Sequence, residues 1–410
     1  MRKKYICGLD IGSFKICATC GRSLPSGKID ILASQIVPAE GLKAGRIINA
    51  KRASLSLREA VEKLSKTCGF RVRRVYANMN SPDLRAKAFS GELFFKKKTR
   101  IKKIHIARLV NSCISSQLPL NRKVIHTGVR NFILDNGVNS LYPEGRKVQG
   151  MKLDIVLINA LIPTIRNFVR CIHGAGLILE DIVPSACAQA EGLIREGQEE
   201  TSGKNNILID VGRELTRISF LKDRLLYNMI SLPLGAQSIT EAIALKLKVP
   251  IGCAEELKIK YGRAYSENDF FTQRIMVKDG LTNKTIKMGQ LSEIIIVKTD
   301  ELLDQVNKTL VKLDCEDTRL SEVIITGGGS ILEGFLERAE RLLNRPVKMG
   351  FLSKVSDSRI QGMSGFYATS IGLVQSSLRK KDNLNFFTKT KFGSFMRLLN
   401  QAEGLYKEYF

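Results

Sequence analysis

Two aspartates, each followed two residues later by a glycine, are the residues of this chain best suited to chemistry. Asp10-Ile11-Gly12-Ser13 and Asp210-Val211-Gly212 each lie between short apolar runs that are typical of β-strands. A glycine in such a turn lets a phosphate approach the backbone, where a side chain would collide with it. The carboxylate can hold Mg²⁺ directly or through water. One Asp-x-Gly turn is also ordinary turn chemistry, so it is the pair that favours a phosphate and metal site.

A third glycine turn follows a buried apolar strand. Val323-Ile324-Ile325-Thr326 runs into Gly327-Gly328-Gly329-Ser330, and residues 335–343 then have helical spacing. A turn without side chains at the start of a helix lets a nucleoside pack against the backbone. Lys15 lies where it could neutralise phosphate charge. Together the three turns predict one nucleotide clamped between two similar domains.

The elements around the two aspartate turns repeat. Strands are predicted over residues 5–9, 15–22 and 28–37 around the first turn, and over 207–209, 216–222 and 225–230 around the second. The same order of strand, turn and two strands recurs about two hundred residues later, which indicates an internal duplication of a domain. Helices are predicted over residues 51–67, 165–175, 246–262, 290–313 and 365–378.

Bulk composition narrows the class of protein. A chain of 410 residues is too long for one ordinary core, so we expect at least two domains. A content of 44% hydrophobic and 26% charged residues is typical of globular proteins and argues against extensive disorder. The formal net charge of +25 predicts anionic partners, namely nucleic acid, anionic lipid or an acidic protein; the alternative is a role in solubility alone.

The cysteines and the apolar segments bear on the compartment. Nine cysteines are scattered along the chain, mostly in apolar runs, as expected of reduced, buried thiols in a cytosolic protein. Cys17 and Cys20 have the spacing of a metal or redox pair, but no second pair or nearby His completes a zinc site, so structural cysteines are favoured. No signal peptide is predicted, and the apolar segment 155–165 is too short to span a bilayer. We therefore expect a soluble body whose membrane contact is peripheral.

A shift in composition after Pro82 marks an insertion. Basic residues crowd between Lys96 and Lys103, and short strands with one helix predict a small α+β subdomain. The basic run could contact anionic lipid or nucleic acid, or form a solvated face; without interleaved aromatic residues, no specific nucleic-acid partner is expected. The predicted domains are residues 1–82 with 154–198, the insert 83–153, residues 205–240 with 320–378, a subdomain 241–319, a linker 379–391 and a final helix 392–410.

The final helix is predicted to be amphipathic. Its apolar residues fall on one face, among them Phe392, Phe395, Met396, Leu399, Tyr406 and Phe410. Arg397 and Lys407 are balanced by Glu403 and Glu408, and the flanking Lys389 and Lys391 supply the excess charge. Binding would therefore depend mainly on burial of apolar side chains, at roughly 25 cal/mol per Å². This predicts a reversible membrane anchor; the alternative is a helix docked on the body.

The motifs resemble those of a known superfamily. The two aspartate turns, Ile325-Thr326-Gly327-Gly328-Gly329-Ser330 and the helix Ala254 to Lys258 look like the phosphate-1, phosphate-2 and adenosine motifs of the actin/Hsp70/hexokinase superfamily. Within it, the chain resembles the FtsA family of bacterial cell-division proteins. The basic insert after Pro82, the stretch Glu293 to Leu303 and the C-terminal helix match that family's special subdomain, its FtsZ-contacting helix and its membrane-targeting tail.

The resemblance implies an α/β, actin-like, duplicated ATPase-type fold with an inserted small α+β subdomain (1C) and a C-terminal amphipathic helix. Residues 1–82 with 154–198 would be the first actin-like domain, 1A. Residues 205–240 with 320–378 would be the second, 2A, and residues 241–319 would be subdomain 2B. ATP and Mg²⁺ are the implied cofactors, with Asp10 and Asp210 as metal ligands, directly or through water. The implied nucleotide residues are Asp10, Gly12, Ser13, Lys15, Asp210 and Gly212 at the phosphates, Gly327, Gly328 and Gly329 at the nucleoside, and Glu255 and Lys258 near ribose and base. Lys298 is the implied contact to the FtsZ C-terminal peptide.

The implied function is a cell-division protein that binds ATP, self-associates like actin and tethers FtsZ filaments to the inner face of the cytoplasmic membrane at the division site. Its partners would be FtsZ, further copies of itself, anionic membrane lipid and downstream division proteins. A small-molecule kinase of the superfamily is one alternative, and it would need a catalytic carboxylate facing a substrate pocket. An actin-like adaptor of pilus or secretion assemblies is another, and it would share the body but not the detached helix.

One departure from the family pattern affects the chemistry. After Gly212 the family usually continues with small residues and threonine, whereas this chain has Arg213, Glu214 and Leu215. Arg213 could add a phosphate contact, and Glu214 would repel one. We therefore predict at most a weak ATPase, mainly a nucleotide-binding scaffold, and assign no catalytic residue; the alternative is a scaffold that keeps the fold and binds ATP weakly.

Overall fold

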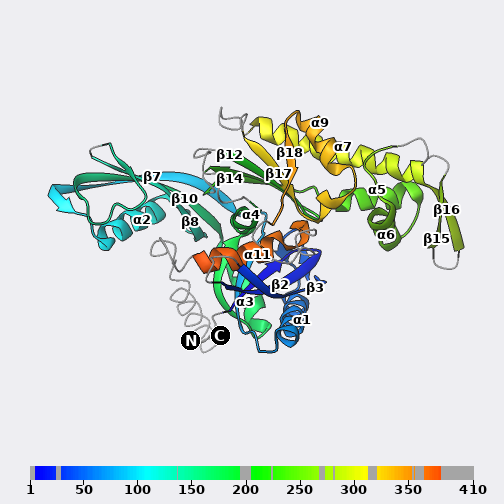
Figure 1. The fold of residues 1–410 in the computed structure, drawn as a ribbon, viewed down its shortest axis with the longest axis horizontal. Coiled ribbons are helices and arrows are strands. Elements are labelled where there is room, and N and C mark those ends of the chain that lie inside the picture. Colours follow the sequence, from blue (N-terminus) through cyan, green and yellow to red (C-terminus); the bar gives the residue numbers. More distant parts are fainter. Residues whose placement is uncertain are drawn as a thin grey trace.

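The computed structural model describes residues 5–24, 29–135, 137–193, 205–222, 225–266, 273–279, 282–312, 321–352, 355 and 364–379. Two five-stranded sheets form its centre, with one subdomain extending to either side (Figure 1). The predicted linker 379–391 begins at Arg379, which is the last residue of α11; its other residues and the predicted final helix 392–410, with its six apolar contact residues, lie outside the described residues.

The first sheet has the strand order β11-β6-β1-β2-β3. Its strands are β1 (Ile6–Ile11), β2 (Lys15–Ser23), β3 (Ile29–Pro38), β6 (Arg74–Met79) and β11 (Ile178–Pro184). Strands β1, β2 and β3 pair antiparallel, whereas β6 runs parallel to both β1 and β11.

The second sheet repeats the first. Its order is β14-β13-β12-β17-β18, with β12 (Asn205–Val211), β13 (Thr216–Lys222), β14 (Leu225–Leu232), β17 (Glu322–Thr326) and β18 (Val347–Met349). The first three strands pair antiparallel, and β17 runs parallel to both β12 and β18. Read from the opposite edge, as β18-β17-β12-β13-β14, the second sheet has the same strand order and directions as the first. This match confirms the predicted duplication.

Helices separate and cover the two sheets. The outer face of the first sheet carries α1 (Ala50–Cys68) and α3 (Ile162–Gly174). Its inner face carries α4 (Ser185–Leu193) and α11 (Ser364–Arg379), which pack against each other between the sheets (Figure 1). The outer face of the second sheet is covered by α7 (Met288–Lys312) and α9 (Phe335–Leu343). Both sheets are therefore buried on both faces, which explains their nearly continuous apolar strands.

The insert is a four-stranded sheet of order β7-β10-β8-β9 with one helix. Its elements are β7 (Arg85–Arg100), α2 (Lys103–Gln117), β8 (Arg122–Leu134), β9 (Asn139–Ser140) and β10 (Lys147–Leu161). The expectation of short strands was wrong. Three of the strands are long because they continue from the insert into the first domain: β10 contributes Leu153 to the core of the insert and Ala160 to that of the first domain.

The second subdomain contains α5 (Gln237–Leu247), α6 (Ile251–Tyr261) and the hairpin of β15 (Arg274–Asp279) and β16 (Thr282–Lys287). The prediction of one helix over residues 246–262 was wrong. Lys248 takes the left-handed conformation with a φ of 49°, and Pro250 caps the start of α6. Proline has no backbone N–H and disfavours a helical residue before it, so the chain ends one helix and begins another.

Within the described residues, no helix is long and apolar enough to cross a membrane. Cys17 and Cys20 are buried free thiols on β2, as the sequence predicted, and Cys17 Sγ lies 3.3 Å from Ser370 Oγ of α11.

Gly372 on α11 should be intolerant of any side chain. A Cβ there would overlap the backbone carbonyl of Ala188 on α4, because the two helices cross backbone to backbone. We expect Gly372→Ala to lower the free energy of unfolding by about 1–3 kcal/mol, measured by urea denaturation. Gly252→Ala is the control: a Cβ at Gly252, inside α6, would meet no atom within 4 Å, so this variant should be neutral or gain up to about 1 kcal/mol. Equal stability of the two variants would contradict the packing argument.

Candidate functional site

A cleft of about 400 Å³ lies between the two sheets. The structure brings all of the predicted nucleotide residues to its wall: Asp10, Gly12, Ser13, Lys15, Asp210, Gly212, Glu255, Lys258, Gly327, Gly328 and Gly329. Their roles toward a ligand stay predictions. Lys298 is not part of the cleft and lies on α7, where its Nζ is 2.6 Å from Glu301 Oε2.

The two aspartate turns have the same geometry. In the first, between β1 and β2, the Gly12 N–H donates to the Lys15 carbonyl at 3.0 Å; in the second, between β12 and β13, the Gly212 N–H donates to the Leu215 carbonyl at 2.9 Å. Both turns line the cleft, one from each sheet. The duplication therefore places two equivalent backbone turns on opposite walls, an arrangement able to hold phosphate from two sides.

Asp10 ends up partly buried at the C-terminal end of β1. The Asn78 side-chain amide donates to Asp10 Oδ1 at 2.7 Å and to Ser185 Oγ at 3.0 Å, while Asn78 Oδ1 accepts the Ile11 N–H at 2.6 Å. Burial raises the pKa of Asp10 to about 6; Lys15 and the Asn78 hydrogen bond act against this rise, and Asp210 adds to it. The first carboxylate is thus held in one orientation and gains its charge only near neutral pH.

Asp210 occupies the equivalent place on β12. Gln189 of α4 donates through Nε2 to Asp210 Oδ2 at 2.9 Å and to Thr369 Oγ1 of α11 at 3.1 Å. Arg217, opposite Asp210 in the β12–β13 register, is buried, and its Nη1 and Nη2 have no hydrogen-bond partner. Burial lowers the pKa of Arg217 to about 10, and the nearby Asp210 acts in the opposite direction.

The triglycine turn packs against the second aspartate turn. Gly327 has a φ of 96°, and a Cβ there would lie 2.5 Å from Asp210 Oδ1, so only glycine fits. A Cβ at Gly329 would lie 2.6 Å from Val211 Cγ1, whereas one at Gly328 would meet nothing. A short 3₁₀-helix, η3 (Gly328–Ile331), precedes α9. Gly328 is thus the exposed glycine of the turn and offers bare backbone to a ligand.

Glu255 and Lys258 on α6 form a partly buried ion pair. Lys258 Nζ lies 2.8 Å from Glu255 Oε2 and donates to Thr240 Oγ1 at 2.7 Å and to the Ala236 carbonyl at 3.2 Å. Burial lowers the pKa of Lys258. Burial also opposes the charge on Glu255, but hydrogen bonds from Lys258 and Thr240 outweigh it, and the pKa of Glu255 is lowered. The pair is therefore charged at neutral pH and leaves little capacity for further bonds.

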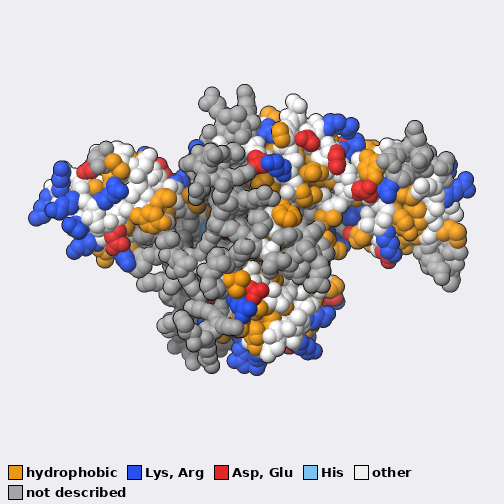
Figure 2. All heavy atoms as spheres, viewed as in Figure 1, with side chains coloured by type: hydrophobic (Ala, Val, Ile, Leu, Met, Phe, Trp, Pro, Cys, Tyr) orange, Lys and Arg blue, Asp and Glu red, His pale blue; other side chains and the backbone are white. Residues whose placement is uncertain are grey.

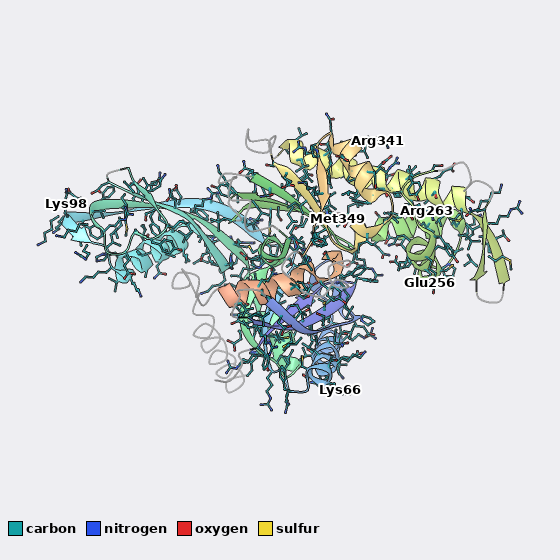
Figure 3. All side chains as sticks on the ribbon, in the orientation of Figure 1. Lys66, Lys98, Glu256, Arg263, Arg341 and Met349 are labelled. Carbon is teal, nitrogen blue, oxygen red and sulfur yellow. The ribbon has the colours of Figure 1, made fainter. Side chains whose placement is uncertain are left out.

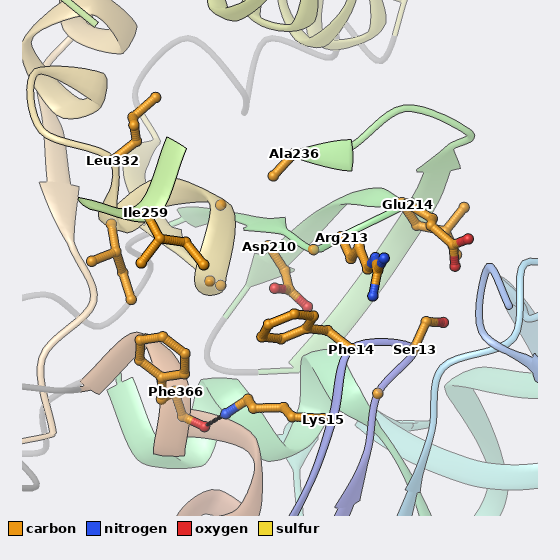
Figure 4. Close-up of a pocket in the computed structure, with 18 of the residues that line it drawn as sticks. Ser13, Phe14, Lys15, Asp210, Arg213, Glu214, Ala236, Ile259, Leu332 and Phe366 are labelled. Atoms are coloured by element: carbon orange, nitrogen blue, oxygen red, sulfur yellow. Dashed lines mark hydrogen bonds between the residues drawn. The ribbon is translucent and has the colours of Figure 1, made fainter. Parts of the chain in front are cut away.

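Two side chains of the second turn have partners that the sequence did not reveal. Glu214 accepts the backbone N–H of Ala44, in the small hairpin of β4 (Leu42–Lys43) and β5 (Arg46–Ile47), and Figure 4 shows it turned away from Asp210. Arg213 donates through Nε to Gln237 Oε1 at 2.9 Å, and its guanidinium lies 5.5 Å from the centre of the Phe14 ring. Glu214 is thus bonded to the backbone of the β4–β5 hairpin, and its predicted repulsion of phosphate stays a prediction.

Lys15 reaches across the cleft toward α11. Its Nζ donates to the Phe366 carbonyl and lies 4.8 Å from the centre of the Phe366 ring (Figure 4). Phe366 shares its end of the cleft with Ile259 and Leu332, which makes that end apolar. The cleft thus has a polar end at the two aspartates and an apolar end beyond Lys15.

Sequence reasoning missed Asn78, Gln189 and Arg217. Each is a polar residue with apolar neighbours in the chain: Asn78 lies between Ala77 and Met79, Gln189 between Ala188 and Ala190, and Arg217 is followed by Ile218. A buried polar group usually has a partner, so such an isolated polar residue was the available signal. Which partner it has depends on the pairing of β6 with β1, the packing of α4 under β12 and the register of β13.

The raised pKa of Asp10 predicts how stability changes with pH. Between the ordinary carboxyl pKa and about 6, the folded protein binds a proton that the unfolded chain has lost, so stability falls as pH rises through that window. Between pH 4.5 and 7 we expect Asp10 to lower the free energy of unfolding by about 1–2 kcal/mol. Urea denaturation of wild type and Asp10→Asn at both pH values measures this. Parallel pH dependence of the two proteins would contradict the assignment.

The duplicated sheets, the crossing helices α4 and α11 and the cleft between the sheets define the class of protein. Two solved structures share this fold. The PilM–PilN type IV pilus biogenesis complex superposes with a TM-score of 0.66 at 16% identity, over 92% of this chain and 99% of that chain. MreB5 of Spiroplasma citri bound to ADP superposes with a TM-score of 0.56 at 11% identity, over 92% of this chain and 98% of that chain. The chain has the actin-like ATPase fold, as the sequence predicted.

Sequence comparison shows which family within this class the chain is similar to. The model of the family "Cell division protein FtsA" matches residues 207–372. The cell division protein FtsA of Pseudomonas aeruginosa is 24% identical over 382 residues, which cover 93% of this chain and 91% of that one. The chain is thus similar to FtsA proteins over nearly its whole length.

Proposed function

We propose that this protein binds ATP and Mg²⁺ in the cleft between its two sheets and, as a self-associating actin-like scaffold, tethers FtsZ filaments to the inner face of the cytoplasmic membrane. The observation that carries the nucleotide proposal is the meeting of all the predicted nucleotide residues in one cleft, with equivalent turns on opposite walls. A protein with the same fold, MreB5 of Spiroplasma citri, has been solved with ADP.

The polar end of the cleft suits the phosphates. The turns at Gly12 and Gly212 would approach them through the backbone, as anion-binding turns do. Lys15 and Arg213 would supply positive charge. Lys15 would first have to release the Phe366 carbonyl, whereas Arg213 could act from its position near the Phe14 ring. Glu214, which accepts the Ala44 N–H, would not contact the phosphates. The apolar end with Ile259, Leu332 and Phe366, next to Gly328, would take the nucleoside.

The residues present also fit Mg²⁺. Asp10 and Asp210 are hard oxygen donors, and each carboxylate has one oxygen held by an amide, from Asn78 and Gln189, so that the other can face a metal ion or its water. Mg²⁺ is usually held by one or two carboxylates together with substrate phosphates. When bound, the ion would neutralise phosphate charge, and the task of this chain's residues would be to orient the two carboxylates. No general base is assigned, and any ATPase activity would be weak.

Calorimetric titration of ATP and ADP into the full chain with Mg²⁺ tests the nucleotide proposal. We expect saturable binding at one site per chain. A folded protein that takes up neither nucleotide would overturn the proposal and leave a nucleotide-free scaffold.

The tether would need two further contacts. FtsZ would bind the subdomain around α7, and the predicted helix 392–410, beyond the described end of α11, would insert in the membrane. The protein would thus be cytoplasmic and peripheral, at the division site. Self-association would multiply weak single-tail attachment, because several linked tails bind far more tightly than one. Downstream division proteins would be further partners.

Lys298→Glu should weaken binding of the FtsZ C-terminal peptide. Lys298 is partly exposed on α7 and has Glu301 as its ion-pair partner, so reversal removes a cation and leaves two acids side by side. We expect a loss of about tenfold, the equivalent of about 1.4 kcal/mol, in fluorescence anisotropy with a labelled peptide. Glu301→Gln, which releases Lys298 from its pair, is the control and should bind at least as well as wild type. Unchanged binding by Lys298→Glu would exclude this contact.

A further inference from the structure

The outer face of the first domain carries an unbalanced basic surface. It comprises the exposed cations of α1, α3 and the loop into β6, which we call the outer basic face: Lys51, Arg52, Arg58, Lys63, Lys66, Arg71, Arg73, Arg166 and Arg170. The acidic residues exposed on the same helices are Glu59 and Glu62, both on α1. Lys and Arg side chains gather at the bottom of the molecule in Figure 2, and Lys66 of α1 is labelled at the bottom of Figure 3.

The two helices form one continuous surface. Ser54 Oγ of α1 donates to the Cys171 carbonyl of α3 at 2.9 Å, and Arg58 Nη2 donates to the Gly174 carbonyl at 2.9 Å. The opposite side of α1 is packed in the core through residues such as Leu57 and Leu64. The cations are therefore held on a rigid, outward-facing layer.

Pairing of charges distinguishes this face from other helices of the molecule. On α6 and α7, exposed lysines have acidic partners three or four residues away, as in Lys260–Glu256, Lys298–Glu301 and Lys308–Asp304. On α1 only Lys63 has such a partner, Glu59, at 2.7 Å. Among the residues described, Lys51, Arg52 and Arg166 make no ion pair. An ordinary solvated face would not need this excess, because interspersed acids serve solubility equally well.

Apolar side chains lie among these cations. Leu55, in the middle of the exposed stripe of α1, is 54% exposed, and Ile48, just before the helix, is 66% exposed. Cations that surround exposed aliphatic side chains on a helix surface are typical of proteins that rest on an anionic lipid surface. Nucleic acid is less suited: α1 contains no aromatic residue and Phe168 of α3 is buried, so the helices offer no platform for bases.

The C-terminal tail carries little net charge, so most of the attraction to anionic lipid would have to come from elsewhere on the molecule. Between Gly393 and Phe410, Arg397 and Lys407 are balanced by Glu403 and Glu408, so the flanking Lys389 and Lys391 supply the excess positive charge of the tail. We propose that the outer basic face binds anionic lipid headgroups and gives the protein a second, electrostatic attachment to the membrane. The inference builds on the proposed tether, in which the tail brings the body to the bilayer.

Two variants with the same change in net charge test the proposal. Lys51→Glu/Arg52→Glu/Arg166→Glu reverses three cations of the outer basic face, and Lys96→Glu/Lys98→Glu/Arg100→Glu reverses three exposed cations of β7 in the insert. Acidic residues in the first turn of α1 are favourable to the helix, and a thermal melt by circular dichroism checks that both variants fold. Each full-length protein is sedimented with phosphatidylcholine vesicles and with vesicles that also contain phosphatidylglycerol.

We expect wild type to prefer the anionic vesicles, and the α1/α3 variant to lose that preference. At roughly fivefold per cation, three reversed cations should weaken anionic binding on the order of a hundredfold, with neutral binding unchanged. The insert variant should keep most of the preference. Equal losses in both variants would show a bulk charge effect, and no loss in the α1/α3 variant would exclude the face; both outcomes overturn the inference.

Further outcomes separate this inference from the tether. If wild type ignores neutral vesicles but the α1/α3 variant still loses anionic binding, the tail proposal fails and the outer basic face stands. If wild type binds both vesicle types equally, the tether stands and the face is excluded. Loss of duplex DNA binding by the α1/α3 variant, with vesicle binding intact, would assign the face to nucleic acid instead.

Discussion

Asp210→Asn is expected to weaken binding of Mg²⁺–ATP by between about tenfold and a hundredfold, since a hydrogen bond or ion contact to a charged group contributes about 1.5–3 kcal/mol. Asp210 lies at the end of β12, with Gln189 holding one oxygen and Gly327 packed against the other. Asparagine keeps the shape of the side chain, so the loss reports the charge. Calorimetry with ATP, and the rise of the melting temperature with ATP, measure it.

Glu214→Gln is the matched control for this prediction. It removes the same charge from the same turn, but Glu214 is bonded to the Ala44 N–H and turned away from Asp210. Its effect on ATP affinity should therefore be small, within about threefold, which corresponds to less than 1 kcal/mol. A larger effect of Glu214→Gln than of Asp210→Asn would mean that the phosphates lie against the hairpin of β4 and β5 and not between the two aspartates.

Removal of residues 392–410 is expected to release the protein from membranes. The predicted helix buries Phe392, Phe395, Met396, Leu399, Tyr406 and Phe410, and at roughly 25 cal/mol per Å² its loss should reduce vesicle binding by at least about a hundredfold. Flotation with vesicles, with and without FtsZ, measures the loss. These residues lie outside the described part of the chain, so the prediction depends on their spacing alone.

Two single substitutions distinguish insertion of the helix from a general effect of the tail. Phe395→Glu places a charge on the predicted apolar face and should weaken binding strongly. Gln401→Glu adds the same charge on the opposite side of the helix and should have little effect. Equal effects of the two would contradict an amphipathic helix, and flotation of the truncated protein at the wild-type level would exclude the tail as anchor.

Local patterns predicted much of the site. The turns Asp10-Ile11-Gly12 and Asp210-Val211-Gly212 were recognisable because the same arrangement of carboxylate and glycine between apolar runs occurs twice. Their repetition predicted the duplication that the two sheets confirm. The predicted helix 246–262 began too early, although Pro250 marked the start of α6, and most of α5 was not predicted.

Contacts between segments far apart in the chain could not be predicted in this way. Asn78 meets Asp10 because β6 lies beside β1 in parallel, and Gln189 meets Asp210 because α4 crosses beneath the second sheet. The orientation of Glu214 depends on a hairpin that is 170 positions earlier in the chain. No local spacing rule carries such information, since each contact depends on how whole elements pack.

From the sequence alone one could predict the resemblance to FtsA proteins, the duplicated actin-like fold and the glycine and aspartate turns of the cleft, because backbone turns and apolar periodicity are local properties of the chain. How these residues are held depends on the tertiary structure. It places Asp10 where burial raises its pKa to about 6, and it ties Lys15 to α11. It also turns Glu214 away from Asp210 and gathers the cations of α1 and α3 on one outer face with few acidic residues among them. Burial, hydrogen-bond partners and the balance of charge on a surface all depend on neighbours that only packing brings together.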